Sequence, residues 1–130
     1  MNNKSILIID DDLIFCDMLG EVLRAEGAVV SVAHDGVQGV SVANATRPDI
    51  IVCDYMMPVM HGTEVLEAVR STTWGGEVPF VLLTNMGQPE ILPQGSEKYS
   101  LCLLKTDWTL DQLAGKITEI LADNGSSLVS

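Results

Sequence analysis

The chain alternates between two hydrophobic periods, and this alternation restricts its fold more than any other feature. Five short runs rich in isoleucine, valine and leucine recur along it, at residues 5–9, 28–32, 49–53, 79–84 and 101–104. Each run is far below the roughly 20 apolar residues of a membrane span and has the length of a buried strand. Most of the segments between the runs have helical spacing instead, so strands and helices are expected to alternate.

The helical segments show apolar residues at i, i+3 and i+4. In 13–26 this spacing covers the whole segment, and Gly27 follows it as a stop signal. A second helix must end before Pro48, because the residue preceding a proline disfavours helical geometry. A third is expected after Gly62 and the last over 110–121.

Three short patterns predict where helices begin. Asp12 is expected to cap the first helix, since a side-chain oxygen at that position accepts a hydrogen bond from the first turn. Asp35 with Gln38, and Thr109 with Gln112, have the spacing of capping boxes for two further helices.

Strands alternating with helices predict an α/β fold, with a doubly wound, five-stranded parallel sheet and helices on both faces. The strand order common for this size is 2-1-3-4-5, as in flavodoxin, with ligands bound where the order reverses, outside the carboxyl ends of the first and third strands. The fourth connection, 85–100, is interrupted by Pro89, Pro93 and Gly95. We therefore expect an irregular fourth helix there.

The charge balance argues against nucleic acid as a ligand. Seven basic residues stand against eighteen acidic ones, a net charge of −11, so phosphate backbones would be repelled. No secretion signal is visible at the N-terminus, and three cysteines without a CxxC pair are typical of a reducing cytoplasm. We expect a cytoplasmic protein that binds no membrane, with one domain over residues 1–122 and a polar tail over 123–130.

Polar side chains stand at the carboxyl ends of four predicted strands. Asp10 and Asp11 follow the first strand, Asp54 the third, Thr84 ends the fourth and Lys105 follows the fifth. In the expected strand order the three carboxylates converge in one crevice and need counter-charge, which Mg²⁺ can supply with few protein ligands. Together with a lysine and a hydroxyl, such a site stabilises a phosphoryl group in transfer. Asp54 is the best candidate for a nucleophile that becomes an aspartyl phosphate.

Four motifs carry a resemblance to a known family: "ILIIDDD", "PDIIVCDYMMPVMHG", "VLLTN" and "LLKTD". They resemble the response-regulator receiver domain of two-component signalling over about residues 4–122. The resemblance implies that Asp54 accepts a phosphoryl group from a phosphohistidine of a sensor histidine kinase or a histidine phosphotransfer protein. The chain would then be a phosphorylation-controlled interaction switch or phosphorelay intermediate, which catalyses only its own phosphorylation and dephosphorylation.

The resemblance also implies a role for each site residue. Asp11 and Asp54 would bind Mg²⁺ directly and Asp10 through water, with the backbone carbonyl of Met56 completing the protein ligands. Lys105 and the hydroxyl of Thr84 would contact phosphoryl oxygens. Family members rearrange the face made by their fourth helix, fifth strand and fifth helix, through which a dimer is one expectation. The sequence does not identify the downstream protein target.

Several positions depart from the family pattern. Cys102 stands where an aromatic residue usually turns inward on activation, Asn85 where a small residue is usual, and Thr106 where a proline is usual. Met56 and Met86 lie two residues after the phosphoacceptor and the threonine. Neither can orient an attacking water as an amide or acid could, so slow self-dephosphorylation is expected.

Other functions stay open from the sequence alone. A receiver-like module that is never phosphorylated would keep the fold and use a fixed surface. A Mg²⁺-dependent phosphohydrolase would match the pattern Asp10-x-Asp12, although 130 residues leave no room for a cap domain. A flavodoxin-like flavin binder is disfavoured, because three aspartates would repel the flavin phosphate.

Overall fold

The expected parallel sheet is present in the computed structural model, which describes residues 2–85 and 99–123. Its five strands are β1 (Ser5–Ile9), β2 (Val29–Ala33), β3 (Ile50–Asp54), β4 (Phe80–Thr84) and β5 (Ser100–Leu104). All neighbouring strands are parallel, and their order is β2-β1-β3-β4-β5. Strand number, direction and order are therefore confirmed.

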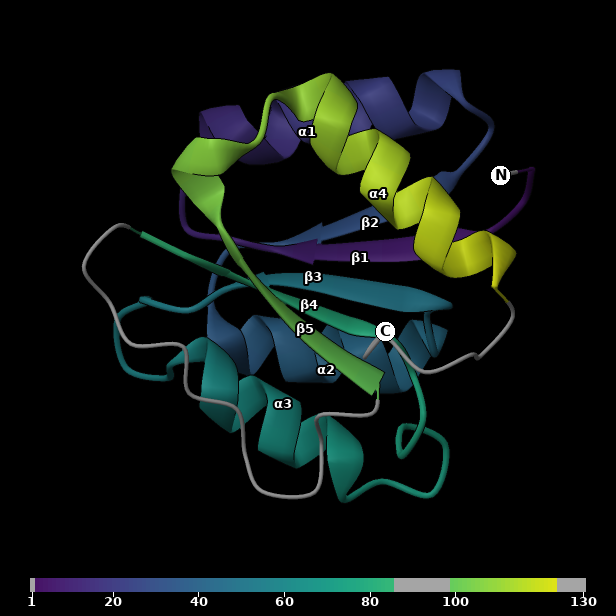
Figure 1. Ribbon diagram of the computed structural model, residues 1–130. Helices are drawn as coiled ribbons and strands as arrows, with labels where there is room; N and C mark the ends of the chain where they lie inside the picture. The colour runs from purple at the N-terminus through teal and green to yellow at the C-terminus, as the bar shows by residue number, and fades with distance from the viewer. Residues whose placement is uncertain (1, 86–98, 124–130) are drawn as a thin grey trace.

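Helices cover both faces of the sheet, as predicted (Figure 1). They are α1 (Leu13–Ala25), α2 (Gly36–Thr46), α3 (Gly62–Arg70) and α4 (Leu110–Ala122), with a short 3₁₀ helix, η2 (Lys105–Asp107), after β5. Helices α1 and α4 lie on one face and α2 and α3 on the other. The irregular fourth helix expected from the sequence and the polar tail from residue 124 lie outside the described residues, so α4 is the helix expected as the fifth.

The period-two alternation of the strands divides the core into two layers. In β1, Ile6 and Ile8 pack on the side of α1 and α4, whereas Leu7 and Ile9 pack on the side of α2 and α3. All four side chains are fully buried. Two buried faces explain why the strands read as continuous apolar runs rather than as alternating ones.

The second strand begins one residue later than predicted, at Val29 instead of Ala28. Gly27 has a φ of +95°, its N–H donates to the carbonyl of Arg24, and the N–H of Ala28 donates to the carbonyl of Leu23. These two bonds form a Schellman motif that ends α1. Ala28 thus belongs to the helix end, although its apolar side chain reads as part of the strand.

Two of the predicted helix caps are confirmed. The Asp12 carboxylate accepts a hydrogen bond of 3.1 Å from the N–H of Phe15 at the start of α1. At the start of α4, the Thr109 hydroxyl accepts from the N–H of Gln112, and the Gln112 side chain accepts from the N–H of Thr109. Each cap satisfies a backbone donor that the helix itself leaves unpaired.

The third predicted cap is half wrong. The Asp35 carboxylate accepts from the N–H of Gln38, as a capping box requires. The Gln38 side chain, however, accepts from the N–H of His34, one residue before the cap. The reciprocal half of the box is therefore replaced by a contact to the end of β2.

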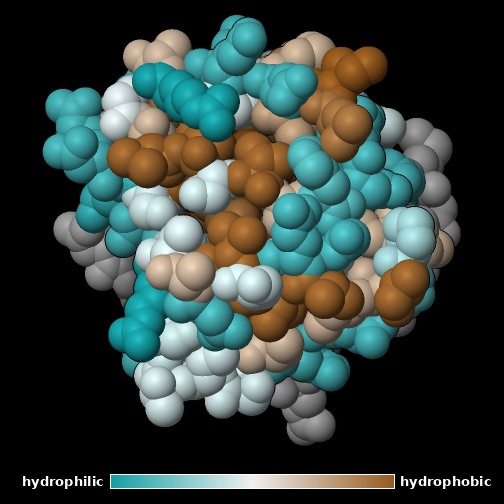
Figure 2. Space-filling model, turned by 180° about the vertical axis from the view of Figure 1, so that it is seen from behind, coloured by the Kyte–Doolittle hydropathy of each residue, from teal (hydrophilic) through white to brown (hydrophobic). Residues whose placement is uncertain are grey.

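The face turned away from the viewer in Figure 1 carries apolar side chains in a broken band between hydrophilic ones (Figure 2). Strand β2 is an edge strand of the sheet, and most of its side chains are half-buried or exposed, with Val29 55% exposed. Other large apolar side chains reach the surface on three further segments. They are Leu13, Ile14 and Met18 of α1, Val37 of α2, and Met56 and Val59 after β3.

Candidate functional site

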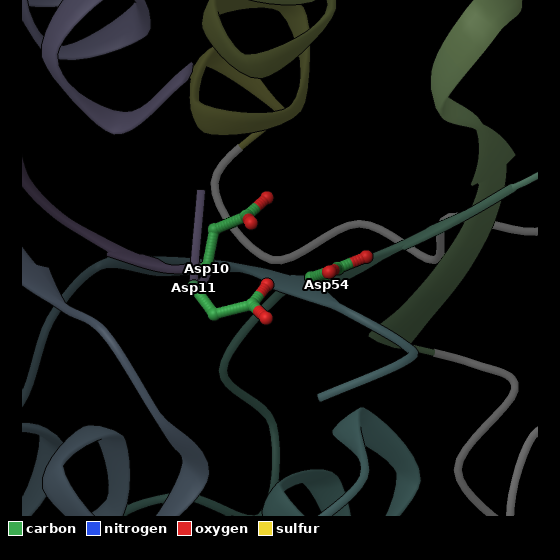
Figure 3. A group of neighbouring side chains, drawn as sticks. All are labelled: Asp10, Asp11 and Asp54. Atoms are coloured by element: carbon green, nitrogen blue, oxygen red, sulfur yellow. The ribbon is translucent and has the colours of Figure 1, made fainter. Parts of the chain in front are cut away.

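Three carboxylates converge at the carboxyl edge of the sheet. Asp10 and Asp11 follow β1, and Asp54 is the last residue of β3, which is paired directly with β1. One oxygen from each carboxylate lies within 4.8 Å of the others. Figure 3 shows Asp10 and Asp11 extending from the end of β1 toward Asp54. The topology rule that placed these residues together from the sequence thus predicts their positions well.

The three carboxylates differ in their exposure to solvent. Asp10 is 1% and Asp54 5% exposed, whereas Asp11 is exposed. The pKa of Asp54 is raised to about 7, mainly by burial and also by the charges of Asp10 and Asp11, while the charge of Lys105 and the N–H of Tyr55 act in the opposite direction. Burial therefore favours the protonated carboxyl, and a cation at the cluster would favour its ionised form.

One oxygen of Asp54 is not satisfied by the protein. Oδ1 is buried and has no hydrogen-bond partner among the described residues. A buried, unpartnered carboxylate oxygen is costly, so the group must gain from a proton or from a cation. Oxygen ligands of this type, few in number and open on one side, suit Mg²⁺, which keeps several of its own waters. The donor set therefore fits a magnesium ion.

Lys105 lies next to Asp10 of the cluster, at the start of η2. Its Nζ is 2.7 Å from Oδ2 of Asp10 and 4.2 Å from the ring centroid of Phe15. Burial alone would lower the pKa of Lys105, but the hydrogen bond to Asp10 and the charges of Asp10 and Asp54 outweigh burial and raise it. Lys105 is thus a firmly charged cation at the site. The same contact opposes burial at Asp10, whose pKa is nevertheless raised.

Thr84 is fully buried at the end of β4. Its hydroxyl donates a hydrogen bond of 3.4 Å to the carbonyl of Leu103 in β5. The sequence placed Thr84 at the correct edge of the sheet. In this structure the hydroxyl is directed to the neighbouring strand, so it would have to change partner to reach a group on Asp54.

The loop after β3 is held close to the site by backbone contacts. The N–H of Gly62 donates to the carbonyl of Tyr55, and a Cβ at Gly62 would overlap the carbonyl oxygen of Asp54 and the side chain of Leu82. Only glycine fits this close approach. Met56 lies in this loop with its side chain 47% exposed. The role of its backbone carbonyl as a metal ligand stays a prediction.

The positions that depart from the family pattern lie around the site. Cys102 is half-buried and packs against the core layer under α2 and α3, while Asn85 is exposed. Thr106 is exposed in the middle of η2. Met86, expected to slow dephosphorylation, lies outside the described residues. No disulfide joins the three cysteines, all of which are described.

Among the described residues, Phe15 is one that sequence reasoning did not assign to the site. Its position on α1 follows the apolar spacing of the core, and its side chain is half-buried against that core. The sequence signal for this role is that Phe15 lies in the first turn of α1, directly after the acidic cluster. That place brings an aromatic ring to the carboxyl edge of the sheet, where Lys105 also lies.

Known proteins share both the sequence pattern and the fold. A family model described as the response regulator receiver domain matches residues 6–117. The response regulator MprA of Mycobacterium ulcerans is 32% identical over 116 residues, which cover 89% of this chain and 49% of that protein. The chain therefore spans about half the length of that relative.

Two solved structures are similar over nearly the whole chain. The chemotaxis response regulator CheY4 of Vibrio cholerae has 26% identity and a TM-score of 0.77, covering 92% of this chain and 99% of that one. A putative response regulator from Chloroflexus aurantiacus has 27% identity and a TM-score of 0.80, with 93% and 99% covered. In the described part of this chain, no helix is both long enough and apolar enough to cross a membrane.

Proposed function

This chain belongs to the response regulator receiver family of two-component signalling, and from that premise we propose that Asp54 accepts a phosphoryl group in a Mg²⁺-dependent reaction. The observation that carries the proposal is the state of the Asp54 carboxylate. It is buried, it has one oxygen without a partner among the described residues, and Asp10, Asp11 and Lys105 surround it. A carboxylate in that setting can act as a nucleophile toward a phosphoryl group that Mg²⁺ and Lys105 hold beside it.

The transfer exchanges one bond to phosphorus for another. A carboxylate oxygen of Asp54 attacks the phosphorus of a phosphohistidine, and the phosphorus–nitrogen bond breaks. The electron pair of that bond stays on the imidazole nitrogen, which takes up a proton. The products are an acyl phosphate on Asp54 and a neutral histidine on the donor. Ionised Asp54 is the attacking form, and a cation at the cluster would favour it over the protonated form that burial favours in the metal-free protein.

The acidic cluster would hold the magnesium ion. Asp11 and Asp54 would supply direct ligands, Asp10 would act through a water, and the backbone carbonyl of Met56 would complete the protein ligands. When bound, Mg²⁺ neutralises the oxygens of the phosphoryl group and of the carboxylates. Asp10 also keeps the ammonium of Lys105 at the site until the donor arrives.

Two side chains would change partner during the transfer. Lys105 turns its ammonium from Asp10 to a phosphoryl oxygen, and Thr84 turns its hydroxyl from the carbonyl of Leu103 to another. Both residues lie at strand ends beside the cluster, so the changes are local. Loss of the Thr84–Leu103 bond would alter the β4–β5 contact and pass the signal toward the protein surface.

The phosphoryl donor is a sensor histidine kinase or a histidine phosphotransfer protein, and the output is binding to a downstream protein target. The domain is accordingly a cytoplasmic switch or relay intermediate that catalyses only its own phosphorylation and dephosphorylation. Dimerisation through β5, α4 and the fourth-helix segment is part of the proposal, and most of that segment lies outside the described residues. We further propose slow loss of the phosphate, because the Met56 side chain cannot orient a water.

Acetyl phosphate with Mg²⁺ tests the proposal without knowledge of the kinase. Intact-protein mass spectrometry should show a gain of one phosphoryl group in the wild type. It should show none with EDTA in place of Mg²⁺ and none in Asp54→Asn. A folded wild-type protein that gains no mass under these conditions would instead be a receiver-like interaction module that works without phosphorylation.

A further inference from the structure

The ammonium of Lys105 is held by two different groups. One is the carboxylate of Asp10, at 2.7 Å, and the other is the face of the Phe15 ring, at 4.2 Å from Nζ to the ring centroid. That distance is well inside the roughly 6 Å within which an aromatic face attracts a cation. The Lys105 side chain is only 18% exposed, so little water separates the charge from the ring.

The ring is fixed relative to the acidic cluster by the first turn of α1. Asp12 accepts a hydrogen bond from the N–H of Phe15, and the thiol of Cys16 donates one of 3.4 Å to the carbonyl of Asp10. The Phe15 side chain also packs against the core layer under α1 and α4. These contacts join the Phe15 ring to the start of α1 and to the acidic edge of the sheet.

The two contacts differ in what happens to them when a cation binds. Asp10 is shared, because its carboxylate would also support Mg²⁺, and each positive charge weakens its hold on the other. The Phe15 ring takes no part in metal binding. It is therefore the contact that can keep Lys105 in place after Asp10 has turned to the metal. Lysine has a long, flexible stem and a strongly hydrated charge. Without the contact to the ring, the ammonium of Lys105 would therefore favour bulk water.

We propose that Phe15 is a positioning residue for Lys105, whose ring face holds the ammonium within reach of the phosphoryl group on Asp54. The expected consequence, a faster phosphoryl transfer, rests on the proposed function. The contact between Phe15 and Lys105 does not. Because the contact is electrostatic, its strength follows the electron density of the ring and not only its size. That dependence separates positioning from simple packing.

The first experiment compares variants at position 15 by their phosphorylation rate with acetyl phosphate. Phe15→Leu and Phe15→Met fill similar space without a ring and should slow the reaction about three- to tenfold. Phe15→Tyr and Phe15→Trp keep an aromatic face and should retain most of the wild-type rate. Mg²⁺ affinity should stay within about twofold in all four, because no metal ligand is changed. Met18→Leu, an exposed position on the same helix, is the matched control and should change nothing.

The second experiment keeps the shape of the ring and changes only its charge distribution. Phenylalanine with one, two or three fluorine atoms is introduced at position 15 alone. Each fluorine withdraws electron density from the ring face, so the phosphorylation rate should fall stepwise along the series while thermal stability stays level. Equal rates along the series, or equal losses in Phe15→Leu and Phe15→Trp, would overturn the proposal.

A direct view of the contact separates this proposal from the proposed function. In the wild-type protein without any donor, the Cε protons of Lys105 should show the upfield NMR shift of a group above a ring face. Phe15→Leu should remove the shift. If the wild type is not phosphorylated but the shift is present and is lost in Phe15→Leu, the proposed function fails and the contact stands. If the shift is absent in the wild type, the positioning role is wrong whatever the phosphorylation result.

Discussion

The middle and the carboxyl end of the same strands behave in opposite ways. Within β1 and β3 every side chain from Ile6 to Ile9 and from Ile50 to Cys53 is fully buried and apolar, and packs against a helix layer. At the ends of these strands stand Asp10 and Asp54, which are also buried but carry charge that the protein only partly satisfies. Burial stabilises the first region and destabilises the second. The fold therefore loses stability at one edge of the sheet, where a carboxylate with an unpartnered oxygen is kept out of water.

The largest effect is expected in the middle of the strands. Ile8→Ala removes a fully buried side chain of β1 and should lower the free energy of unfolding by about 2–5 kcal/mol. Ile14→Ala is the matched control, since Ile14 is 71% exposed on α1, and it should cost under about 0.5 kcal/mol. Chemical denaturation of both variants measures the contrast. Equal losses would mean that the strand interior is not the stabilising region.

At the end of β3, a substitution should raise the free energy of unfolding instead of lowering it. The pKa of Asp54 is about 7 in the folded protein, whereas the ordinary pKa of an aspartate, which applies to the unfolded chain, is 3.8. The folded state therefore binds this proton more tightly than the unfolded state. The associated stability is fully present below pH 4 and is lost as the pH rises through 7. With EDTA at pH 8, Asp54→Asn should therefore raise the free energy of unfolding by about 2–4 kcal/mol.

The gain should shrink as the pH falls from 8 toward 4, because the wild-type carboxyl becomes protonated and no longer carries a buried charge. Denaturation curves of wild type and Asp54→Asn at several pH values check this trend. Saturating Mg²⁺ should also reduce the gain by stabilising the wild type alone. A variant that is less stable than the wild type at pH 8, or a gain independent of pH, would contradict the description of Asp54 as an unsatisfied buried acid.

Within the edge itself, adjacent carboxylates should have separate roles. Asp11→Asn should weaken Mg²⁺ binding and Mg²⁺-dependent phosphorylation by about tenfold or more, because it removes a charged ligand. Asp12→Asn should change both by less than about twofold, since asparagine caps a helix as well as aspartate does. Titration with Mg²⁺ followed by NMR measures the affinities. Similar losses in the two variants would overturn this division.

The smallest effect concerns the loop that borders the site. Val59 has a φ of +70° and is 95% exposed, so a β-branched residue adopts a left-handed conformation without packing to support it. Val59→Gly should raise the free energy of unfolding by up to about 1 kcal/mol, because relief of strain exceeds the added flexibility of the unfolded chain. Val37→Gly, on the exposed face of α2, has no such strain and should lose about 0.5 kcal/mol. A loss at both positions would argue against strain at Val59.

The contrast between the two regions also explains what the sequence could predict. Strand number, order and the convergence of Asp10, Asp11 and Asp54 follow from the apolar runs and from one topological rule, so they are visible without coordinates. Each depends on which residues end a strand and not on side-chain detail. The first residue of a strand is harder to predict where an apolar residue belongs to the end of the preceding helix, as Ala28 does.

Contacts that depend on how neighbouring elements are placed in space are not predictable in the same way. The Gln38 side chain was expected to bond the residue three positions earlier, but it bonds the N–H of His34, whose position depends on the end of β2. Phe15 has the spacing of a core residue, and nothing local shows that Lys105 lies over its ring. The unpartnered oxygen of Asp54 likewise follows from the surroundings of the strand end and not from the motif that contains it.

We propose that the unsatisfied carboxylate at the end of β3 is the phosphoacceptor. The most direct measurement treats the protein with acetyl phosphate and Mg²⁺, reduces the acyl phosphate with borohydride, and locates the reduced residue by tandem mass spectrometry. Reduction is expected at position 54 in the wild type, and at no position when Mg²⁺ is replaced by EDTA. Reduction at Asp10 or Asp11 with Asp54 intact, or a Mg²⁺-independent product, would contradict the proposal.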